Sequence, residues 1–187
     1  MGDDLFADQR LYDHLLLLDW ELCERARRAG CPQCAGRLHS ASYPRKPRGI
    51  PPGLDDATHR RRLSLCCAGC RKRVTPPSVR FLGRRVYSGV VMVLACVRTL
   101  NAARLRELKA LLGVDRRTLQ RWRRWWRESL LRSSWWRSAQ ARFLPPLEEP
   151  QLPGALVERF EAADPVRRLA HVLAFLAPLT VAAGHVG

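Results

Sequence analysis

Two closely spaced cysteine pairs constrain this chain more than any other feature of its sequence. The pairs are Cys31-Pro32-Gln33-Cys34 and Cys67-Ala68-Gly69-Cys70. Two residues between the thiols allow one tight turn to direct both sulfurs at a single ion, and two such turns complete the tetrahedral shell of Zn²⁺ with no open position. The sequence therefore predicts a structural Zn²⁺ held by Cys31, Cys34, Cys67 and Cys70 in a small β zinc ribbon.

The second pair leaves an alternative open, because Cys66 and Cys70 also have a workable spacing for one metal ion. We favour Cys67, since Cys66 would lie on the strand that enters the turn and would pack as a small apolar residue. Cys23 and Cys96 lie inside helical patterns and are expected to be buried.

The charge of the chain is high and unevenly distributed. The 187 residues carry a net charge of +16, which divides into −3 for residues 1–30, +21 for residues 31–142 and −2 for residues 143–187. A basic block between mildly acidic ends is typical of a protein that binds a polyanion, because each Lys or Arg that meets a phosphate releases counterions. The central block therefore predicts a nucleic-acid partner.

The first thirty residues lack the basic segment, apolar stretch and cleavage site of a secretory signal. The apolar stretches 15–18 and 169–183 fall short of the roughly 20 residues that cross a bilayer. Paired CxxC motifs in a reducing compartment indicate metal binding rather than disulfides. We expect a cytoplasmic, nucleoid-associated protein without membrane contact.

The pattern of apolar residues predicts a mainly α protein with one small β region. Residues 8–28 are predicted to form one helix, with leucines at positions 11, 15, 18 and 22 and Gly30 as its stop. Short strands are expected over 60–66 and 71–74, on either side of the second cysteine pair. The expected organisation is an N-terminal helix (1–30), a zinc ribbon (31–78), a helix-turn-helix DNA-binding domain (79–142), and a linker with a C-terminal amphipathic helix (143–187).

The region after Pro76-Pro77-Ser78, taken as a linker, has helix-turn-helix spacing. A buried helix is expected over 87–100, a second over 102–112 and a third from Arg116 to Glu128, with an extension to Ser133 left open. Gly113 can adopt the positive φ that ends a helix, and Asp115 can cap the next one. Two short helices joined by a Gly-containing turn of about three residues define this motif.

The third helix is strongly two-sided. At about 100° per residue, its tryptophans at 122, 125 and 126 fall with Thr118 and Leu119 on the inward arc. Its arginines and Gln120 fall on the outward arc. We expect the major groove of double-stranded DNA to contact Arg116, Arg117, Gln120, Arg121 and Arg124. We expect phosphates to contact Arg45, Lys46, Arg48, Arg71, Lys72, Arg73, Arg84 and Arg85.

The sequence gives little support for catalysis, so we do not expect an enzyme. Metal-dependent strand transfer needs three carboxylates around Mg²⁺. The basic block holds only five acidic residues, and no Gly-rich phosphate loop is present.

Three segments together resemble the N-terminal region of bacterial insertion-sequence transposases, which begin with a zinc ribbon and a helix-turn-helix. These segments are Cys31–Cys34, Cys67–Arg73 and Leu108–Trp122, and residues 80–87 are similar to small proteins found beside mobile elements. The acidic catalytic triad of such transposases has no counterpart in this sequence. The resemblance therefore implies a DNA-binding accessory or regulatory factor, acting on transposon ends, and not a transposase.

Two other readings of the same features stay open. An RNA-binding zinc-ribbon protein would account for the charge and the cysteines, but not for the 113–115 turn. An adaptor that binds a separately encoded transposase or recombinase would use the terminal helices, and a homodimer is natural for a helix-turn-helix protein. No small-molecule substrate is expected.

Overall fold

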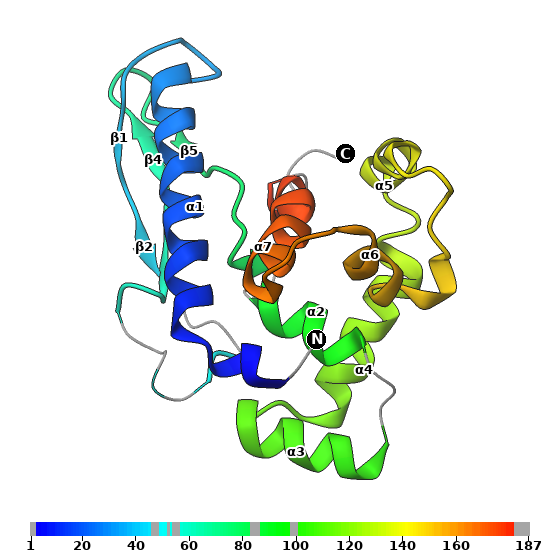
Figure 1. The fold of residues 1–187 in the computed structure, drawn as a ribbon. Helices are drawn as coiled ribbons and strands as arrows, with labels where there is room; N and C mark the ends of the chain where they lie inside the picture. Colours follow the sequence, from blue (N-terminus) through cyan, green and yellow to red (C-terminus); the bar gives the residue numbers. More distant parts are fainter. Residues whose placement is uncertain are drawn as a thin grey trace.

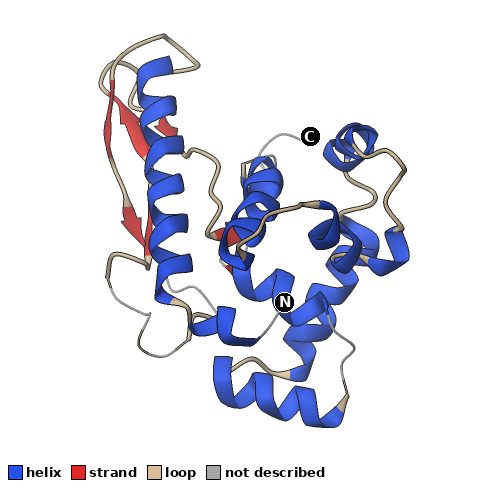
Figure 2. Ribbon diagram, viewed as in Figure 1, coloured by secondary structure: helices blue, strands red, loops and turns tan. Residues whose placement is uncertain are grey.

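The computed structural model describes residues 3–45, 49–51, 53, 57–82, 87–97 and 101–181. Figures 1 and 2 show a mainly helical molecule with small antiparallel sheets, which confirms the predicted fold class at that level. The division into four separate units stays a prediction. None of the helices in the described part of the chain is long and apolar enough to cross a membrane.

The helices are α1 (Gln9–Ala29), α2 (Gly89–Val97), α3 (Ala102–Leu112), α4 (Arg116–Arg124), α5 (Ser134–Ala139), α6 (Gly154–Arg159) and α7 (Pro165–Leu176). Shorter helical turns are η1 (Asp3–Ala7), η2 (Trp125–Ser129), η3 (Gln140–Arg142), η4 (Glu149–Gln151) and η5 (Ala177–Thr180). The strands are β1 (Leu38–Ser40), β2 (Tyr43–Pro44), β3 (Arg61–Arg62), β4 (Leu65–Cys67), β5 (Arg73–Val74), β6 (Phe81–Leu82) and β7 (Tyr87–Ser88).

Helix α1 runs along the whole left side of the molecule in Figure 1 and agrees with the predicted helix to within one residue. It begins where the side chain of Asp8 accepts a hydrogen bond from the backbone N–H of Arg10, and it ends before Gly30, whose φ is 77°. Such a positive φ favours glycine and stops the helix. Its buried side chains include Leu11, Leu15 and Cys23.

The β region is a long hairpin in which each arm is interrupted once, between β1 and β2 and between β3 and β4. Strands β1, β4 and β5 form one sheet, with Leu38 opposite Cys67 and Leu65 opposite Val74, whereas β2 pairs with β3. The predicted strand 60–66 is therefore two strands, because the chain changes sheets at Leu63 and Ser64, both of which are buried. Strands do enter and leave the second cysteine turn, as predicted.

Helix α2 is the centre of the helical part, and its residues from Gly89 to Cys96 are all buried. It packs against α4 and α7. A Cβ at Gly89 would lie 2.9 Å from Leu173 Cδ2, so this position has no room for a side chain. The predicted helix 87–100 starts later than expected, because Tyr87 and Ser88 pair with β6 as strand β7. Residues 98–100 lie outside the described residues.

Helices α3 and α4 and the turn between them match the prediction closely. Asn101 and Asp115 cap the two helices by accepting hydrogen bonds from backbone N–H groups, and Gly113 has a φ of 62°. At Trp125 the helix widens into the π-helical turn η2, in which the N–H of Leu130 donates to the carbonyl of Trp125 at 2.9 Å. The predicted long third helix is thus present but changes its winding halfway.

The C-terminal amphipathic helix is present as α7. Asp164 caps it, and its leucines and valine at 169, 172, 173 and 176 are buried in the main core of the protein. Helix α7 packs against α1 and α2, so its apolar face is covered by its own chain. Helix α5 was not predicted.

A buried ion pair joins α1 to the segment that follows the ribbon. Asp19 and Arg80 are 1% and 5% exposed, and Arg80 Nε donates to Asp19 Oδ2 at 2.8 Å. The same carboxylate accepts from Ser78 Oγ and from the N–H of Val79, each at 2.7 Å. Because every contact crosses about sixty residues of sequence, this network fixes α1 against residues 78–80, the first of which, Ser78, belongs to the predicted linker 76–78.

Replacing Asp19 with Asn should lower the free energy of unfolding by about 3–5 kcal/mol, because Arg80 would stay buried without its counter-charge. Glu21→Gln, on the exposed side of α1, is the matched control and should change it by less than about 0.5 kcal/mol. Urea unfolding of the metal-loaded protein, followed by circular dichroism, measures both. Equal effects of the two substitutions would contradict the structural role of this ion pair.

Candidate metal centre and basic surfaces

The two cysteine turns have the same backbone geometry, which is the reason that they can share one ion. The N–H of Ala35 donates to the carbonyl of Cys31 at 2.7 Å, and the N–H of Arg71 donates to that of Cys67 at 3.1 Å. Ala35 and Arg71, each directly after the second cysteine of its pair, have φ values of 56° and 60°. Non-glycine residues adopt this left-handed conformation infrequently, and its occurrence at both matching positions shows that the two turns repeat one backbone conformation.

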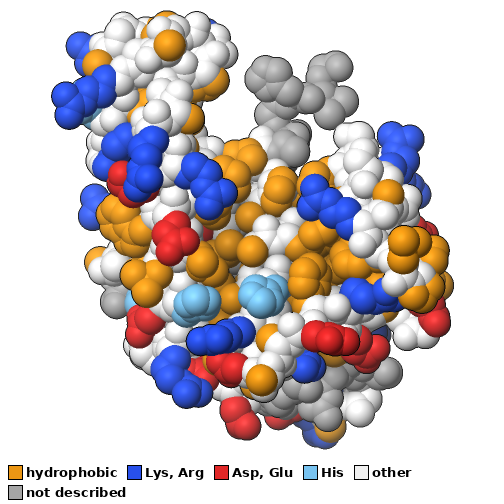
Figure 3. Space-filling view, turned by 45° about the horizontal axis from the view of Figure 1, so that its top comes forward, with side chains coloured by type: hydrophobic (Ala, Val, Ile, Leu, Met, Phe, Trp, Pro, Cys, Tyr) orange, Lys and Arg blue, Asp and Glu red, His pale blue; other side chains and the backbone are white. Residues whose placement is uncertain are grey.

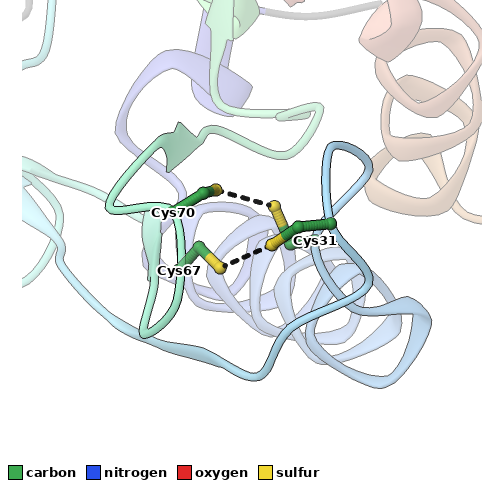
Figure 4. Close-up of side chains that lie close together, drawn as sticks. Cys31, Cys67 and Cys70 are labelled. Carbon is green, nitrogen blue, oxygen red and sulfur yellow. Dashed lines mark hydrogen bonds between the residues drawn. The ribbon is translucent and has the colours of Figure 1, made fainter.

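The four sulfurs point toward one another from these turns. Cys31 Sγ lies 3.5 Å from Cys70 Sγ, Cys34 Sγ lies 3.4 Å from Cys67 Sγ, and all four sulfurs lie within 4.8 Å of one another. Figure 4 shows Cys31, Cys67 and Cys70 directed at this common centre. A tetrahedron of sulfurs at about 2.3 Å from a central ion has edges of about 3.8 Å. The distances are far beyond the roughly 2.05 Å of a disulfide, and the cysteines are free. The cluster fits one tetrahedral metal ion.

Cys67, and not Cys66, belongs to the cluster, as predicted. Both residues lie in β4, and successive side chains of a strand point to opposite faces. Cys66 Sγ instead lies 3.5 Å from the carbonyl oxygen of Arg71, on the partly exposed side of the sheet. The alternation of the strand thus decides between the two neighbouring thiols.

Backbone N–H groups of the turns favour thiolates at the site. A hydrogen bond from the N–H of Cys70 lowers the pKa of Cys67 to about 6, and one from the N–H of Gln33 lowers the pKa of Cys31. The N–H of Lys72 acts in the same direction on Cys70, but desolvation and three neighbouring thiols raise the pKa of Cys70 to about 12. Four thiols crowded in this way suit a cation among them, because a metal ion deprotonates each thiol that coordinates it.

A glycine that sequence reasoning missed gives the sulfurs their space. A Cβ at Gly36 would lie 3.1 Å from Cys67 Sγ and 3.2 Å from Cys34 Sγ, which is tighter than most real contacts. The signal was the glycine two residues after the second cysteine of the first pair. The site also has a small apolar core of its own, in which Cys23 from α1 packs with Leu38 and Leu65 of the sheet.

The outward face of α4 is basic, as predicted. The five residues expected to contact a DNA groove are all exposed: Arg116, Arg117, Gln120, Arg121 and Arg124. Thr118, Leu119, Trp122 and Trp126 are buried and Trp125 is half-buried, which confirms the predicted inward arc. Arg121 differs from the other four because its Nη1 donates to the hydroxyl of Tyr87 at 3.0 Å.

The predicted phosphate contacts divide into three groups. Lys46, Arg48, Arg84 and Arg85 lie outside the described residues. Three others are exposed but have partners within the protein: Arg45 donates to Tyr43, Lys72 to Gln33, and Arg73 to the carbonyl of Ala41 and the hydroxyl of Ser64. Arg71 is exposed and forms no side-chain hydrogen bond or ion pair to the described residues.

The structure does not bring the two predicted basic groups together. The cysteine site follows the C-terminal end of α1, whereas α3 and the start of α4 lie at the opposite, lower end of the molecule in Figure 1. Figure 3 shows Lys and Arg side chains gathered over the ribbon end. The protein therefore has two separate basic regions, one at each end of the molecule.

Comparison with protein-family models, with curated proteins and with solved structures finds no match to this chain.

Cys67→Ser should abolish metal retention, because three sulfurs do not close the shell. Cys66→Ser should retain the metal. The measurement is the content of zinc and iron per chain after dialysis against a weak chelator, with about one ion expected for the parent protein and for Cys66→Ser. The opposite order of the two variants would show that the wrong thiol has been assigned.

Proposed function

We propose that this protein binds double-stranded DNA, with α4 in the major groove and a structural Zn²⁺ in the ribbon. One observation carries the proposal. The exposed face of α4 presents arginines and a glutamine, and the sequence from Arg116 to Arg127 contains no acidic residue. Arginines crowded on one helix face repel one another unless an anion meets them, and the preceding turn has the spacing of a helix-turn-helix.

The inward face of the same helix supports the proposal by fixing its orientation. The ring of Trp122 packs edge-on against Tyr87 with 5.1 Å between centroids, and Trp126 Nε1 donates to the carbonyl of Met92 at 3.1 Å. A helix held by buried aromatic side chains loses little conformational freedom on binding. The arginine face is therefore presented in one arrangement.

Each exposed side chain on α4 has a chemistry that suits the groove. The guanidinium fork matches O6 and N7 of guanine, and the side-chain amide of Gln120 matches N6 and N7 of adenine. The hydrogen bond from Arg121 to Tyr87 limits the reach of that arginine, so the main candidates for base contacts are Arg116, Arg117, Gln120 and Arg124. Arg71 and its neighbours in the ribbon supply phosphate contacts, which add affinity without sequence preference.

The choice of Zn²⁺ follows from the four-cysteine shell. Tetrahedral sites with four thiolates select zinc or iron, and a closed shell without an open position suits a structural role. In this proposal the ion organises the ribbon and takes no part in a reaction. The resemblance to insertion-sequence transposases makes transposon ends the first DNA sequences to try, with the protein as an accessory or regulatory factor.

Gln120→Ala should change sequence preference, because an adenine contact is worth about 1–3 kcal/mol of discrimination. Arg71→Ala should weaken binding to all duplexes alike and reduce the slope of log affinity against log salt by about one unit. The measurement is a salt series of fluorescence anisotropy titrations on a selected duplex, on random duplexes and on single-stranded RNA. Arg132→Ala, an exposed arginine outside α4, is the control.

Three results would replace the proposal with another. If Gln120→Ala lowered the affinity for every duplex equally, the placement of α4 in the groove would be wrong. Tighter binding of single-stranded RNA than of any duplex would favour the RNA-binding alternative. Weak binding of all three nucleic acids, together with co-purification of a transposase or recombinase, would favour the adaptor.

A further inference from the structure

A cavity lies on the arginine-bearing side of the helix formed by α4 and η2, where these elements and α2 meet η4 and α6. Its volume is about 340 Å³, within the range of sites for small ligands, and its lining includes Cys96, Arg123, Arg127, Leu152 and Glu158. None of these residues belongs to the metal centre or to the predicted groove contacts. The cavity is therefore a separate feature of the fold.

Two arginines supply the charge of this cavity. Arg123 and Arg127 are four residues apart, so they lie on the same side of the helix one turn from each other, and both line the cavity. Across the parts of the chain that the structure describes, neither side chain has a hydrogen bond or an ion pair. Each guanidinium carries five N–H donors in a planar fork, and within the described residues none of these donors meets a protein acceptor; Arg123 is half-buried and Arg127 is exposed.

The opposite wall does not neutralise them. Glu158 is the acidic residue of the lining, and it forms no ion pair with either arginine within the described structure. The side-chain amide of Gln151 is already engaged by Glu148. The balance of two cations against one carboxylate leaves the cavity positive, with apolar groups of Cys96, Val97 and Leu152 beside the charges.

We infer that this cavity binds a phosphate group between Arg123 and Arg127. A phosphate offers several acceptor oxygens to the two forks, a geometry that arginine meets better than lysine does. The phosphate has two sources, the backbone of a bound duplex next to the groove that α4 occupies, or a small phosphorylated molecule. Only the first source depends on the proposed DNA binding.

Isothermal titration with pyrophosphate, at an ionic strength held constant with chloride, tests the cavity by itself. The double variant Arg123→Gln/Arg127→Gln should bind pyrophosphate at least about tenfold more weakly than the parent, because it loses two charge-assisted contacts to the anion. Arg132→Gln/Arg137→Gln removes the same charge from exposed positions outside the cavity and should bind like the parent. Circular dichroism verifies that both variants are folded.

A salt series of duplex binding separates the two sources. If the phosphate belongs to DNA, the double variant should reduce the salt slope by about one to two units, the control should not, and pyrophosphate should compete with the duplex. If it belongs to a small molecule, pyrophosphate should bind as above while the duplex slope stays unchanged. The inference is overturned if the double variant matches the control in both titrations, whatever the protein's affinity for DNA.

Discussion

The buried pair between Asp19 and Arg80 holds the two halves of this protein in one arrangement. Removing two charges from water costs several kcal/mol per ion, and only good geometry with further hydrogen bonds offsets it. Asp19 meets that condition with three donors, and Arg80 meets it by also donating to the carbonyls of His59 and Arg61 at 3.0 and 2.7 Å. Asp19 of α1 therefore contacts the chain that leaves the ribbon directly. Through Arg80 it also connects to the backbone of the ribbon.

The network extends to the C-terminal end of the described chain. The N–H of Ser78 donates to the hydroxyl of Thr180 at 2.9 Å, and Thr180 belongs to η5, directly after α7. Helix α1 also contributes to both apolar cores, with Leu11 and Leu15 in the larger and Cys23 in the smaller. The helix thus serves as a strut to which the ribbon and the helical part are each attached. A change in the conformation of the metal centre can therefore reach the helical part through α1.

The sequence predicted the elements whose signals are local. Capping residues and glycines set the ends of α1, α3 and α4, and the strand alternation separates Cys66 from Cys67 in agreement with the predicted ligand set. The two-sided character of α4 was predicted because its tryptophans and its arginines fall on opposite sides of the helix without exception. Each of these features is decided by residues within a few positions of one another.

The features that were missed are decided by residues far apart in the chain. Asp19 follows Leu11 and Leu15 at the same four-residue interval, so a carboxylate in the buried stripe was a visible signal, but its partner Arg80 was not. Tyr87 and Ser88 form strand β7 and not the start of the predicted helix, because their backbone pairs with β6. Within the described part of the chain Arg123 and Arg127 have no partner, which depends on what η4 and α6 place opposite them and which no periodicity reveals.

The proposed binding of a duplex has to accommodate the separation of the two basic regions. The cysteine site lies at the end of the molecule opposite α3 and the start of α4 (Figure 1), so in that proposal the two regions would contact different stretches of the DNA. The ribbon would contact phosphates, and its share of the affinity would fall with salt, whereas the preference of α4 for its bases would persist. The Asp19–Arg80 pair would hold the two contacts in a fixed relation, because it attaches α1 to the chain that leaves the ribbon. A flexible linker in its place would lose this relation without losing a single contact residue.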